Sequence, residues 1–280
     1  MPEIKERTAE KKPAKKYSFA VKTLVAVCGI ALCLVCVFLL PLWGTALLVS
    51  AVNAMMYYEL SNAFGFLKNY NISIVGFIVS CVYPWLFFFN ADKNLFILTV
   101  FIGSALSFFL TLFRKENDAD ELVFSIFAFT VFPVINSLNV EILARDNGKL
   151  LIILPYVCAW GADTFAQITG RICGKHSLIK SVSPNKTIEG FIGEIVGGTL
   201  LSAAAYFIIS KYVDNLSPVI IAVSALGTIL ASLGDLFFSY IKRSKNIKDF
   251  SNLMPGHGGI LDRFDSVMFV LPVFAVILAR

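Results

Sequence analysis

Long runs of apolar residues follow one another along almost the whole sequence, and they constrain the fold more than any other feature. They cover Thr23–Leu40, Leu42–Leu60, Ile74–Phe89, Leu95–Phe113, Leu122–Val140, Leu150–Thr169, Ile188–Ser210, Val219–Ile241 and Ser266–Ala279. A helix needs roughly 20 such residues to cross the hydrocarbon core of a bilayer. Inside a bilayer the backbone polar groups of a single segment must bond within it, as they do in a helix. The pattern predicts an all-α integral membrane protein with about nine transmembrane helices.

The composition excludes other classes of protein. Hydrophobic residues make up 57% of the 280 residues and charged residues only 15%, against about 45–50% and about 25% in soluble domains. The 26 phenylalanines exclude a disordered chain. Five of the six cysteines lie inside apolar runs, where they are expected to be small apolar fillers. Cys33 and Cys36 form a C-x-x-C inside such a run, so neither a disulfide framework nor a zinc site is expected.

The basic residues predict how the helices are oriented across the membrane. If the N-terminus is cytoplasmic, the cytoplasmic segments hold 19 Lys and Arg residues and the outside segments hold five. Short cytoplasmic loops of membrane proteins carry such an excess. The basic tail is interpreted as a cytoplasmic anchor, because an apolar run follows it at once. It does not look like a cleaved signal peptide, and no nucleic-acid partner is expected.

Three parts of the chain differ in character. Residues 1–22 form the basic cytoplasmic tail, and residues 23–145 form an aromatic-rich N-terminal transmembrane region in which Glu59 is the main exception. Residues 146–280 carry nearly all of the charge within apolar runs and most of the glycine clusters, including the G-x-x-x-G of Gly193 and Gly197. Small residues at that spacing allow close helix packing. The catalytic region is therefore expected in 146–280.

Three carboxylates stand inside apolar runs of this third part: Asp163, Glu194 and Asp235. A carboxylate at the centre of a membrane helix costs about 2.5–3.5 kcal/mol, so such residues usually face a polar interior. On the eighth run, polar residues recur every three or four positions, which places them on one face of a helix. They are Thr228, Ser232, Asp235, Ser239 and Lys242. This stripe reaches the end predicted to be cytoplasmic.

The two longest loops of the third part, 170–187 and 242–265, are both predicted to be cytoplasmic. The first combines hydroxyls, lysines and a glycine at a helix entrance, which suits phosphate binding, although it contains no Walker motif. In the second, Asp262 and Asp265 are three residues apart and share one face of a helical turn. With Asp235 they offer three carboxylates near one membrane surface. Hard oxygen ligands of this kind suit Mg²⁺ that bridges nucleotide phosphates.

These loops carry a family resemblance. The sequence reads S-Y-I-K-R at 239–243, K-D at 248–249 and P-G-H-G-G-I-L-D-R-F-D at 255–265. This resembles the signature of phosphatidate cytidylyltransferases, with Met254 where the pattern prefers Leu, Ile or Phe. S-P-N-K-T-I-E-G at 183–190 resembles the S-P-K-K-T-W-E-G of the family, with Asn185 and Ile188 as departures. W-G-A-D at 160–163 resembles the W-x-x-D stretch of the family. The resemblance covers about 155–270.

The resemblance implies a reaction in which CTP and phosphatidic acid give CDP-diacylglycerol and pyrophosphate. It implies metal binding by Asp235 and Asp262, with Asp265 and Asp249 as further candidates, and Mg²⁺ as the cation, leaving a second cation open. Phosphates would be neutralised by Lys186, Lys242 and Arg263. Residues expected to bind or orient the substrates are Asp163, Ser183, Thr187, Glu189, Arg243, Lys248 and His257. The active site is expected at the cytoplasmic side of the C-terminal helices, in a bacterial inner membrane, and a homodimer is expected.

Two other functions remain open at this point. A proton- or ion-coupled transporter would also place Asp and Glu inside membrane helices, although no repeat of broken helices is visible in the two halves. A CTP transferase that acts on a different lipid phosphate would share the motifs. A membrane assembly factor without chemistry would not need the dense stretch at 255–265.

Overall fold

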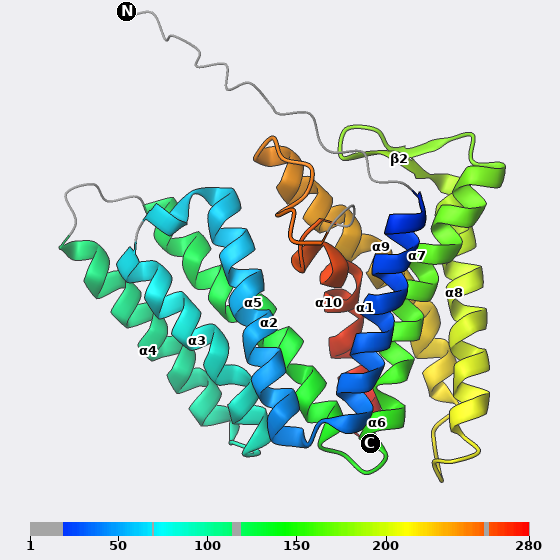
Figure 1. Ribbon diagram of the computed structural model, residues 1–280, viewed down its shortest axis with the longest axis horizontal. Coiled ribbons are helices and arrows are strands. Elements are labelled where there is room, and N and C mark those ends of the chain that lie inside the picture. The colour runs from blue at the N-terminus through cyan, green and yellow to red at the C-terminus, as the bar shows by residue number, and fades with distance from the viewer. Residues whose placement is uncertain (1–18, 69, 114–118, 255–257, 280) are drawn as a thin grey trace, which may run out of the picture.

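The chain folds into a helical protein in which a single short β-hairpin interrupts the series of described helices (Figure 1). This computed structural model describes residues 19–68, 70–113, 119–254 and 258–279. The helices in these ranges are α1 (Phe19–Leu39), α2 (Leu42–Phe64), η1 (Phe66–Lys68), α3 (Tyr70–Phe88), α4 (Lys93–Leu112), α5 (Ala119–Leu143), α6 (Gly148–Leu151), α7 (Ile153–Cys173), α8 (Ile188–Ile209), α9 (Val219–Ser244) and α10 (Leu261–Leu278). The hairpin pairs β1 (Ser177–Ile179) with β2 (Ser183–Thr187) in antiparallel fashion.

Each apolar run of the sequence coincides with a helix. By length and composition, six helical segments of the described chain can cross a membrane, and these are α3, α4, α5, α6–α7, α8 and α9. The prediction of an all-α membrane protein is therefore confirmed in its helical character and in its membrane-length apolar helices, while the β-hairpin departs from it. α1 contributes a shorter apolar helix, Val27–Leu39. α2 and α10 do not meet the same criteria; α2 includes Asn53 and Glu59, and α10 begins with charged residues.

The structure adds details that the apolar runs do not contain. The loop predicted between the sixth and seventh runs holds the β-hairpin, and α10 begins at Leu261, five positions before the run that predicts it. Asp262 and Asp265 therefore both lie in the first turns of α10. Residues 1–18 of the predicted basic tail lie outside the described residues.

Prolines interrupt two helices of the N-terminal region, Pro84 in α3 and Pro133 in α5. A proline has no N–H, so the carbonyl four residues earlier loses its helical partner. For Pro84 this carbonyl belongs to Ser80, and the side-chain amide of Asn53 in α2 donates to it at 3.1 Å. The same amide donates to the carbonyl of Pro133 at 3.2 Å. One buried asparagine thus joins α2, α3 and α5.

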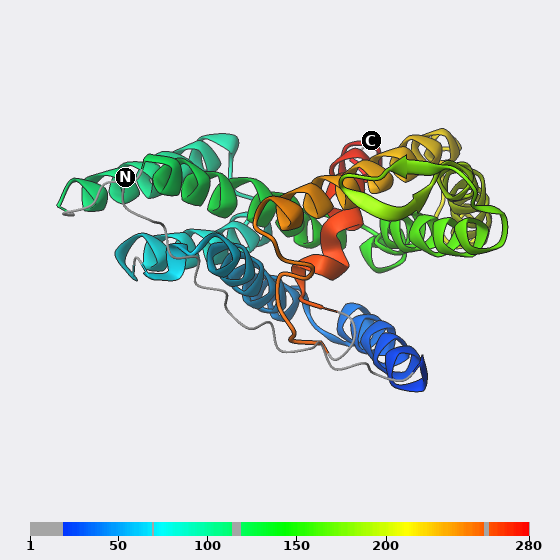
Figure 2. The ribbon, with the colours of Figure 1, turned by 90° about the horizontal axis from the view of Figure 1, so that it is seen from above.

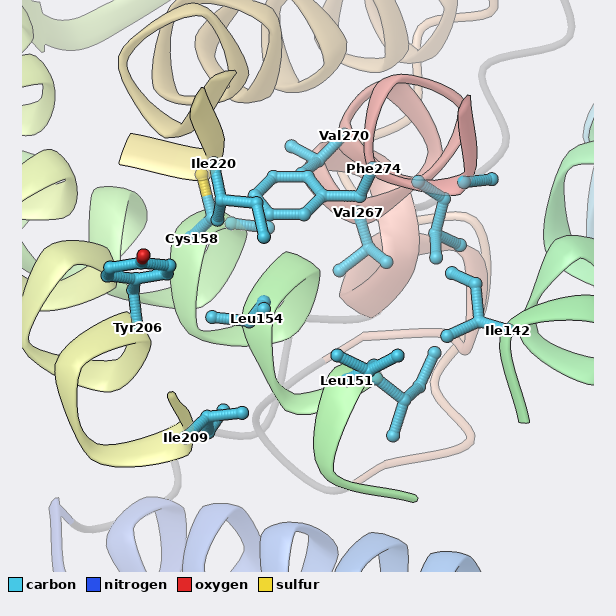
Figure 3. Close-up of a cluster of buried hydrophobic side chains, with 14 of the residues drawn as sticks. Ile142, Leu151, Leu154, Cys158, Tyr206, Ile209, Ile220, Val267, Val270 and Phe274 are labelled. Atoms are coloured by element: carbon cyan, nitrogen blue, oxygen red, sulfur yellow. The ribbon is translucent and has the colours of Figure 1, made fainter. Parts of the chain in front are cut away.

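The helices form two groups, which Figures 1 and 2 show side by side. α2 to α5 pack on one another in one group and α7 to α10 in the other, and α5 also packs against α10. The buried apolar core of the second group draws on α5, α7, α8, α9 and α10 (Figure 3). Leu154 and Cys158 of α7 face Ile220 of α9 and Phe274 of α10 there.

α7 and α8 pack most closely of all, along the glycines of α8. A Cβ atom at Gly193 would clash with Thr169, and one at Gly197 would clash with the ring of Phe165. Glycine is therefore required for the two helices to approach this closely. The hairpin, the loop after α9 and the start of α10 all lie at one end of the helical bundle (Figure 1).

Candidate active site

A cavity of about 660 Å³ opens where the hairpin and the loop after α9 meet the ends of the C-terminal helices. It is polar, although the helices around it are apolar. Its lining is Asp163, Ala166, Gln167, Gly170, Arg171, Ser183, Asn185, Lys186, Thr187, Gly190, Phe191, Glu194, Asp235, Lys242, Asp249, Asp262, Arg263 and Asp265. Asp235 and Lys242 of the polar stripe predicted on α9 thus line the cavity, and so do Asp163, Gln167 and Arg171, which follow one another at four-residue spacing on α7.

Asp262 forms a buried ion pair in the wall of the cavity. One carboxylate oxygen accepts a hydrogen bond from Nζ of Lys242 at 2.8 Å. The other accepts from the backbone N–H groups of Phe250 and Gly259, each at 2.9 Å. Lys242 and Asp262 are both buried. Gly258, with φ of 80°, has the left-handed backbone that favours glycine at this turn. Asp262 therefore fixes the loop after α9 to the first turn of α10.

A second ion pair links the hairpin to α9. Nζ of Lys186 on β2 lies 2.8 Å from a carboxylate oxygen of Asp235 and donates to the hydroxyl of Ser232 at 3.2 Å. Burial by itself lowers the pKa of Lys186, but the negative charges of Asp235, Glu194 and Asp163 outweigh that effect and raise it above its ordinary value. Lys186 is therefore a protonated cation at neutral pH, held among carboxylates.

Two further carboxylates come together where α7 meets α10. The hydroxyl of Ser266 donates to Asp163 at 2.8 Å, and the backbone N–H of Ser266 donates to Asp265 at 2.8 Å. Glu194 of α8 reaches the same cavity and is only 1% exposed, and its Oε1 has no hydrogen-bond partner among the described residues. With Asp235 and Asp262, five carboxylates from α7, α8, α9 and α10 thus face one polar space.

The residues of the 183–190 motif have separate tasks. Thr187 caps α8 and accepts a hydrogen bond from the N–H of Gly190 at 3.0 Å, while Ser183 and Thr187 both line the cavity. Glu189 does not line it. Its carboxylate accepts from the backbone N–H groups of Lys175 and His176, at 3.0 and 3.2 Å, and contacts Nδ1 of His176 at 2.6 Å. Glu189 therefore fastens the base of the hairpin to α8.

Comparison with known proteins decides the family. The model of the cytidylyltransferase family matches residues 20–280. The chain belongs to the cytidylyltransferase family. The family resemblance predicted from the residues at 155–270 is thereby confirmed.

Similar curated proteins carry a more specific name. The phosphatidate cytidylyltransferase of Staphylococcus haemolyticus (strain JCSC1435) is 43% identical over 138 residues, which is 49% of this chain and 52% of that protein. The phosphatidate cytidylyltransferase of Rickettsia typhi is 37% identical over 150 residues, or 52% of this chain and 66% of that protein. That of Staphylococcus aureus (strain COL) is 39% identical over 136 residues, with shares of 49% and 52%. The chain thus spans about half to two thirds of the length of these relatives.

Some predicted site residues lie away from the cavity. Arg243 is exposed and donates to the carbonyl of Ile247 at 3.0 Å, so it closes the end of its own helix. Lys248 is exposed and is not part of the lining. Asp249 and Arg263 are exposed but do line the cavity. His257 lies outside the described residues.

The three carboxylates predicted to bind a metal, Asp235, Asp262 and Asp265, all line the cavity. Among the described residues, no three His, Cys, Asp or Glu side chains are arranged as a ready-made metal site. The oxygens of Asp262 are held by Lys242 and two backbone amides. The donor chemistry nevertheless fits a hard cation, because the cavity presents carboxylate oxygens and no thiolates or imidazoles in its described lining.

Arg171, Glu194 and Ser266 are among the residues that were not assigned to the site from the sequence, and Arg171 lines the cavity. Glu194 was recognised as a charge inside an apolar run, and only the fold shows that it faces the same cavity as Asp163 and Asp235. Ser266 contacts both Asp163 and Asp265. A serine at the start of an apolar run gives no signal of this kind, because serine is common in membrane helices.

Proposed function

We propose that the chain transfers the cytidylyl group of CTP to phosphatidic acid, which gives CDP-diacylglycerol and pyrophosphate. The observation that supports this most strongly is the composition of the cavity. It lies at one end of membrane-length helices, it is lined by acidic and basic side chains, and the family motifs form its walls. A lipid phosphate and a water-soluble nucleotide can meet only at such an interface.

The chemistry requires charge neutralisation more than proton transfer. An ionised phosphate oxygen of the lipid attacks the α-phosphorus of CTP, and the bond from that phosphorus to the bridging oxygen breaks, so that pyrophosphate leaves. The nucleophile is already an anion, so no strong base is needed. Catalysis then depends on positioning and on electrostatic stabilisation. Arg171, Lys186 and Arg263 line the cavity and supply positive charge toward phosphate oxygens.

Asp235 and Asp265 would hold Mg²⁺, with Asp262 beside them and Asp163 and Glu194 as further oxygen donors on the same cavity. A bound divalent cation would supply positive charge to the triphosphate as the leaving bond breaks. Lys242 contributes indirectly, because it neutralises Asp262 and thereby orients it. Ser183 and Thr187 offer hydroxyl donors along the same wall.

We further propose nine membrane spans with the N-terminus and the cavity facing the cytoplasm of a bacterial inner membrane. Residues 146–280 would form the catalytic region, residues 23–145 its helical support and residues 1–22 a basic tail, in a homodimer. The distribution of Lys and Arg supports the orientation. Single cysteines at the exposed positions Ser181 and Asn252 should react with an impermeant reagent only from the cytoplasmic side, and one at Lys211 only from outside. Outside labelling of Ser181 or Asn252 contradicts the orientation.

The activity is tested with purified protein in mixed micelles that contain labelled CTP, phosphatidic acid and Mg²⁺. We expect a lipid-soluble cytidine product that chelation abolishes and added Mg²⁺ restores. Product with another lipid phosphate, but none with phosphatidic acid, would favour a related transferase. A protein without any CTP-dependent product, but with ion flux in vesicles, would favour a transporter.

A further inference from the structure

Glu59 is a buried carboxylate in a region to which the proposed chemistry assigns nothing. It lies in α2, near the end of that helix, and is 1% exposed. Its surroundings are apolar, since Met56, Leu60, Phe250 and Leu261 belong to the buried cluster around it. A buried carboxylate is costly unless its oxygens accept hydrogen bonds. The partners of Glu59 therefore indicate its purpose.

The three hydrogen-bond donors to Glu59 lie in the loop after α9 and at the start of α10. Its Oε1 accepts from the hydroxyl of Ser251 at 2.6 Å and from the backbone N–H of Ile260 at 2.9 Å. Its Oε2 accepts from the backbone N–H of Leu261 at 2.8 Å. Ile260 and Leu261 stand at the beginning of α10. A side chain of the N-terminal helices thus holds the segment in which the motif Asp262-Arg263-Phe264-Asp265 begins.

The start of α10 needs such an acceptor. The first N–H groups of a helix have no partner within it, and Ile260, at the N-cap position, forms no side-chain cap. Glu59 satisfies two of these N–H groups, and its negative charge lies at the positive end of the helix dipole. Gly259 makes the approach possible, because a Cβ atom there would lie 2.5 Å from the carboxylate oxygens of Glu59.

Asp262 holds the same turn from the other side. Its carboxylate accepts from the N–H of Gly259 and faces the cavity, whereas Glu59 accepts from the next two N–H groups and does not line the cavity. Three successive backbone amides are thus divided between two carboxylates, one that belongs to the site and one that lies behind it. The position of Gly259–Leu261, and with it the direction of Asp262 and Asp265, depends on both.

We propose that Glu59 is a positioning residue for the cytidylyl transfer, which fixes the first turn of α10 so that Asp262, Arg263 and Asp265 face the substrates. The proposal rests on the proposed function for its catalytic consequence. It also gives the N-terminal helices a direct part in the site, because Glu59 joins α2 to a turn 201 residues later in the chain.

The test compares Glu59→Gln with Glu141→Gln in the full-length protein. Glutamine has the size of glutamate and keeps one acceptor oxygen, but its NH₂ group would face the N–H of Ile260 or Leu261. A hydrogen bond that holds the start of α10 is therefore lost without a change in side-chain size. Glu141 is a matched control, since it pairs with Arg145 on α5 and does not line the cavity. The measurements are hydrogen exchange of peptides that cover 258–263, melting temperature in detergent, and kcat and KM for each substrate.

We expect Glu59→Gln to speed exchange at 258–263 but not at 183–190, and to lower kcat by about 10- to 100-fold, as loss of a group that orients a catalytic residue typically does. The KM for phosphatidic acid should match that of Glu141→Gln, and the fall in kcat should exceed what any drop in the melting temperature of Glu59→Gln accounts for. Gly259→Ala, which pushes a methyl group against the same carboxylate, should reproduce the pattern.

Unchanged exchange at 258–263, or unchanged kcat, overturns the proposal. So does a loss of activity that only follows the amount of unfolded protein. If wild-type protein forms no CTP-dependent product, the proposed function fails and the catalytic role of Glu59 fails with it. In that case the exchange data still show whether Glu59 holds the start of α10.

Discussion

Both helical groups bury polar side chains, but the two sets differ in kind. In the N-terminal group they are mostly neutral amides and hydroxyls that bond to one another and to the backbone. Asn53 donates to the carbonyls of Ser80 and Pro133, and Asn136 donates to Asn53 at 2.7 Å. In the C-terminal group they are charged, and they converge on the walls of a cavity. Within the N-terminal group Glu59 differs from both sets, because it is charged and reaches across to the second group.

The difference distinguishes two kinds of polar residue inside membrane-length helices, the neutral and the charged. Neutral groups such as Asn53 and Asn136 hold helices together through hydrogen bonds to one another and to the backbone, which an apolar solvent favours. The charged groups, including Glu194, gather on one polar cavity, as ionisable residues within membrane helices usually do. The two groups of helices therefore differ in charge and in convergence on a cavity, and not in the lack of a hydrogen-bond partner, since the hydroxyls of Ser61 and Ser80 also have none among the described residues.

The largest effect on activity is expected from Asp235→Asn. Asp235 is a cavity carboxylate whose partners among the described residues are the side chains of Lys186, at 2.8 Å, and Ser239, so the fold should survive the change. Loss of its charge should lower kcat by at least about 100-fold, because metal binding and transition-state stabilisation both weaken. Initial rates at saturating Mg²⁺ and melting temperature in detergent measure the two effects. Near wild-type turnover would remove Asp235 from the metal site.

Lys242→Met should act on both stability and activity. The pair of Lys242 and Asp262 is buried, and removal of one partner from a buried ion pair costs about 3–5 kcal/mol of unfolding free energy. The double variant Lys242→Met/Asp262→Asn no longer has the unpaired charge, so it should recover much of the stability but no activity. Denaturant titration in micelles, with the transfer assay alongside, checks this. Recovery of activity in the double variant would mean that Asp262 has a structural role only.

Asn53→Ala should affect stability alone. The change leaves the carbonyls of Ser80 and Pro133 and the hydroxyl of Ser137 without the donor that they share. The change also removes the oxygen that accepts from Asn136. Hydrogen bonds between membrane helices contribute roughly 0.6 kcal/mol on average and up to about 1.7 kcal/mol, so loss of this amide suggests a loss of about 2–3 kcal/mol. The kcat of the folded fraction should equal that of wild type. A lower kcat at unchanged stability would show that the N-terminal network also serves catalysis.

The sequence predicts much of the fold and much of the site, for the same physical reason. Hydropathy marks the helices because each must bury its own backbone, and three- and four-residue spacing places Asp163 and Asp235 on faces that meet the two loops. The start of α10 was predicted too late, because Asp262 and Arg263 interrupt the apolar run although a first helical turn accommodates charge. The hairpin was missed because its strands are only three and five residues long.

Glu59 shows where such reasoning ends. Its charge stands out in the sequence, but its partners are backbone N–H groups about 200 residues away, and every residue type except proline carries such a group. No spacing rule connects them. The partner of Lys186 could not be predicted either. Lys186 lies on the hairpin between α7 and α8, whereas Asp235 lies on α9, and only the folded structure brings the two together.

Tyr156→Phe tests a hydrogen bond that links the C-terminal group of helices to the neutral polar network of the N-terminal group. It should have the smallest effect. Tyr156 lies on α7, but its hydroxyl donates to Asn139 of α5 at 2.9 Å, so it adds one hydrogen bond from the C-terminal group to the neutral N-terminal network. Loss of one hydrogen bond between neutral groups costs about 0.5–1.5 kcal/mol. The ring contacts with Trp160 and Phe264 remain in the variant. A small loss of unfolding free energy with unchanged kcat would place Tyr156 among the structural residues. A fall in kcat would instead show that the N-terminal network helps to set the position of α7, and therefore of Asp163.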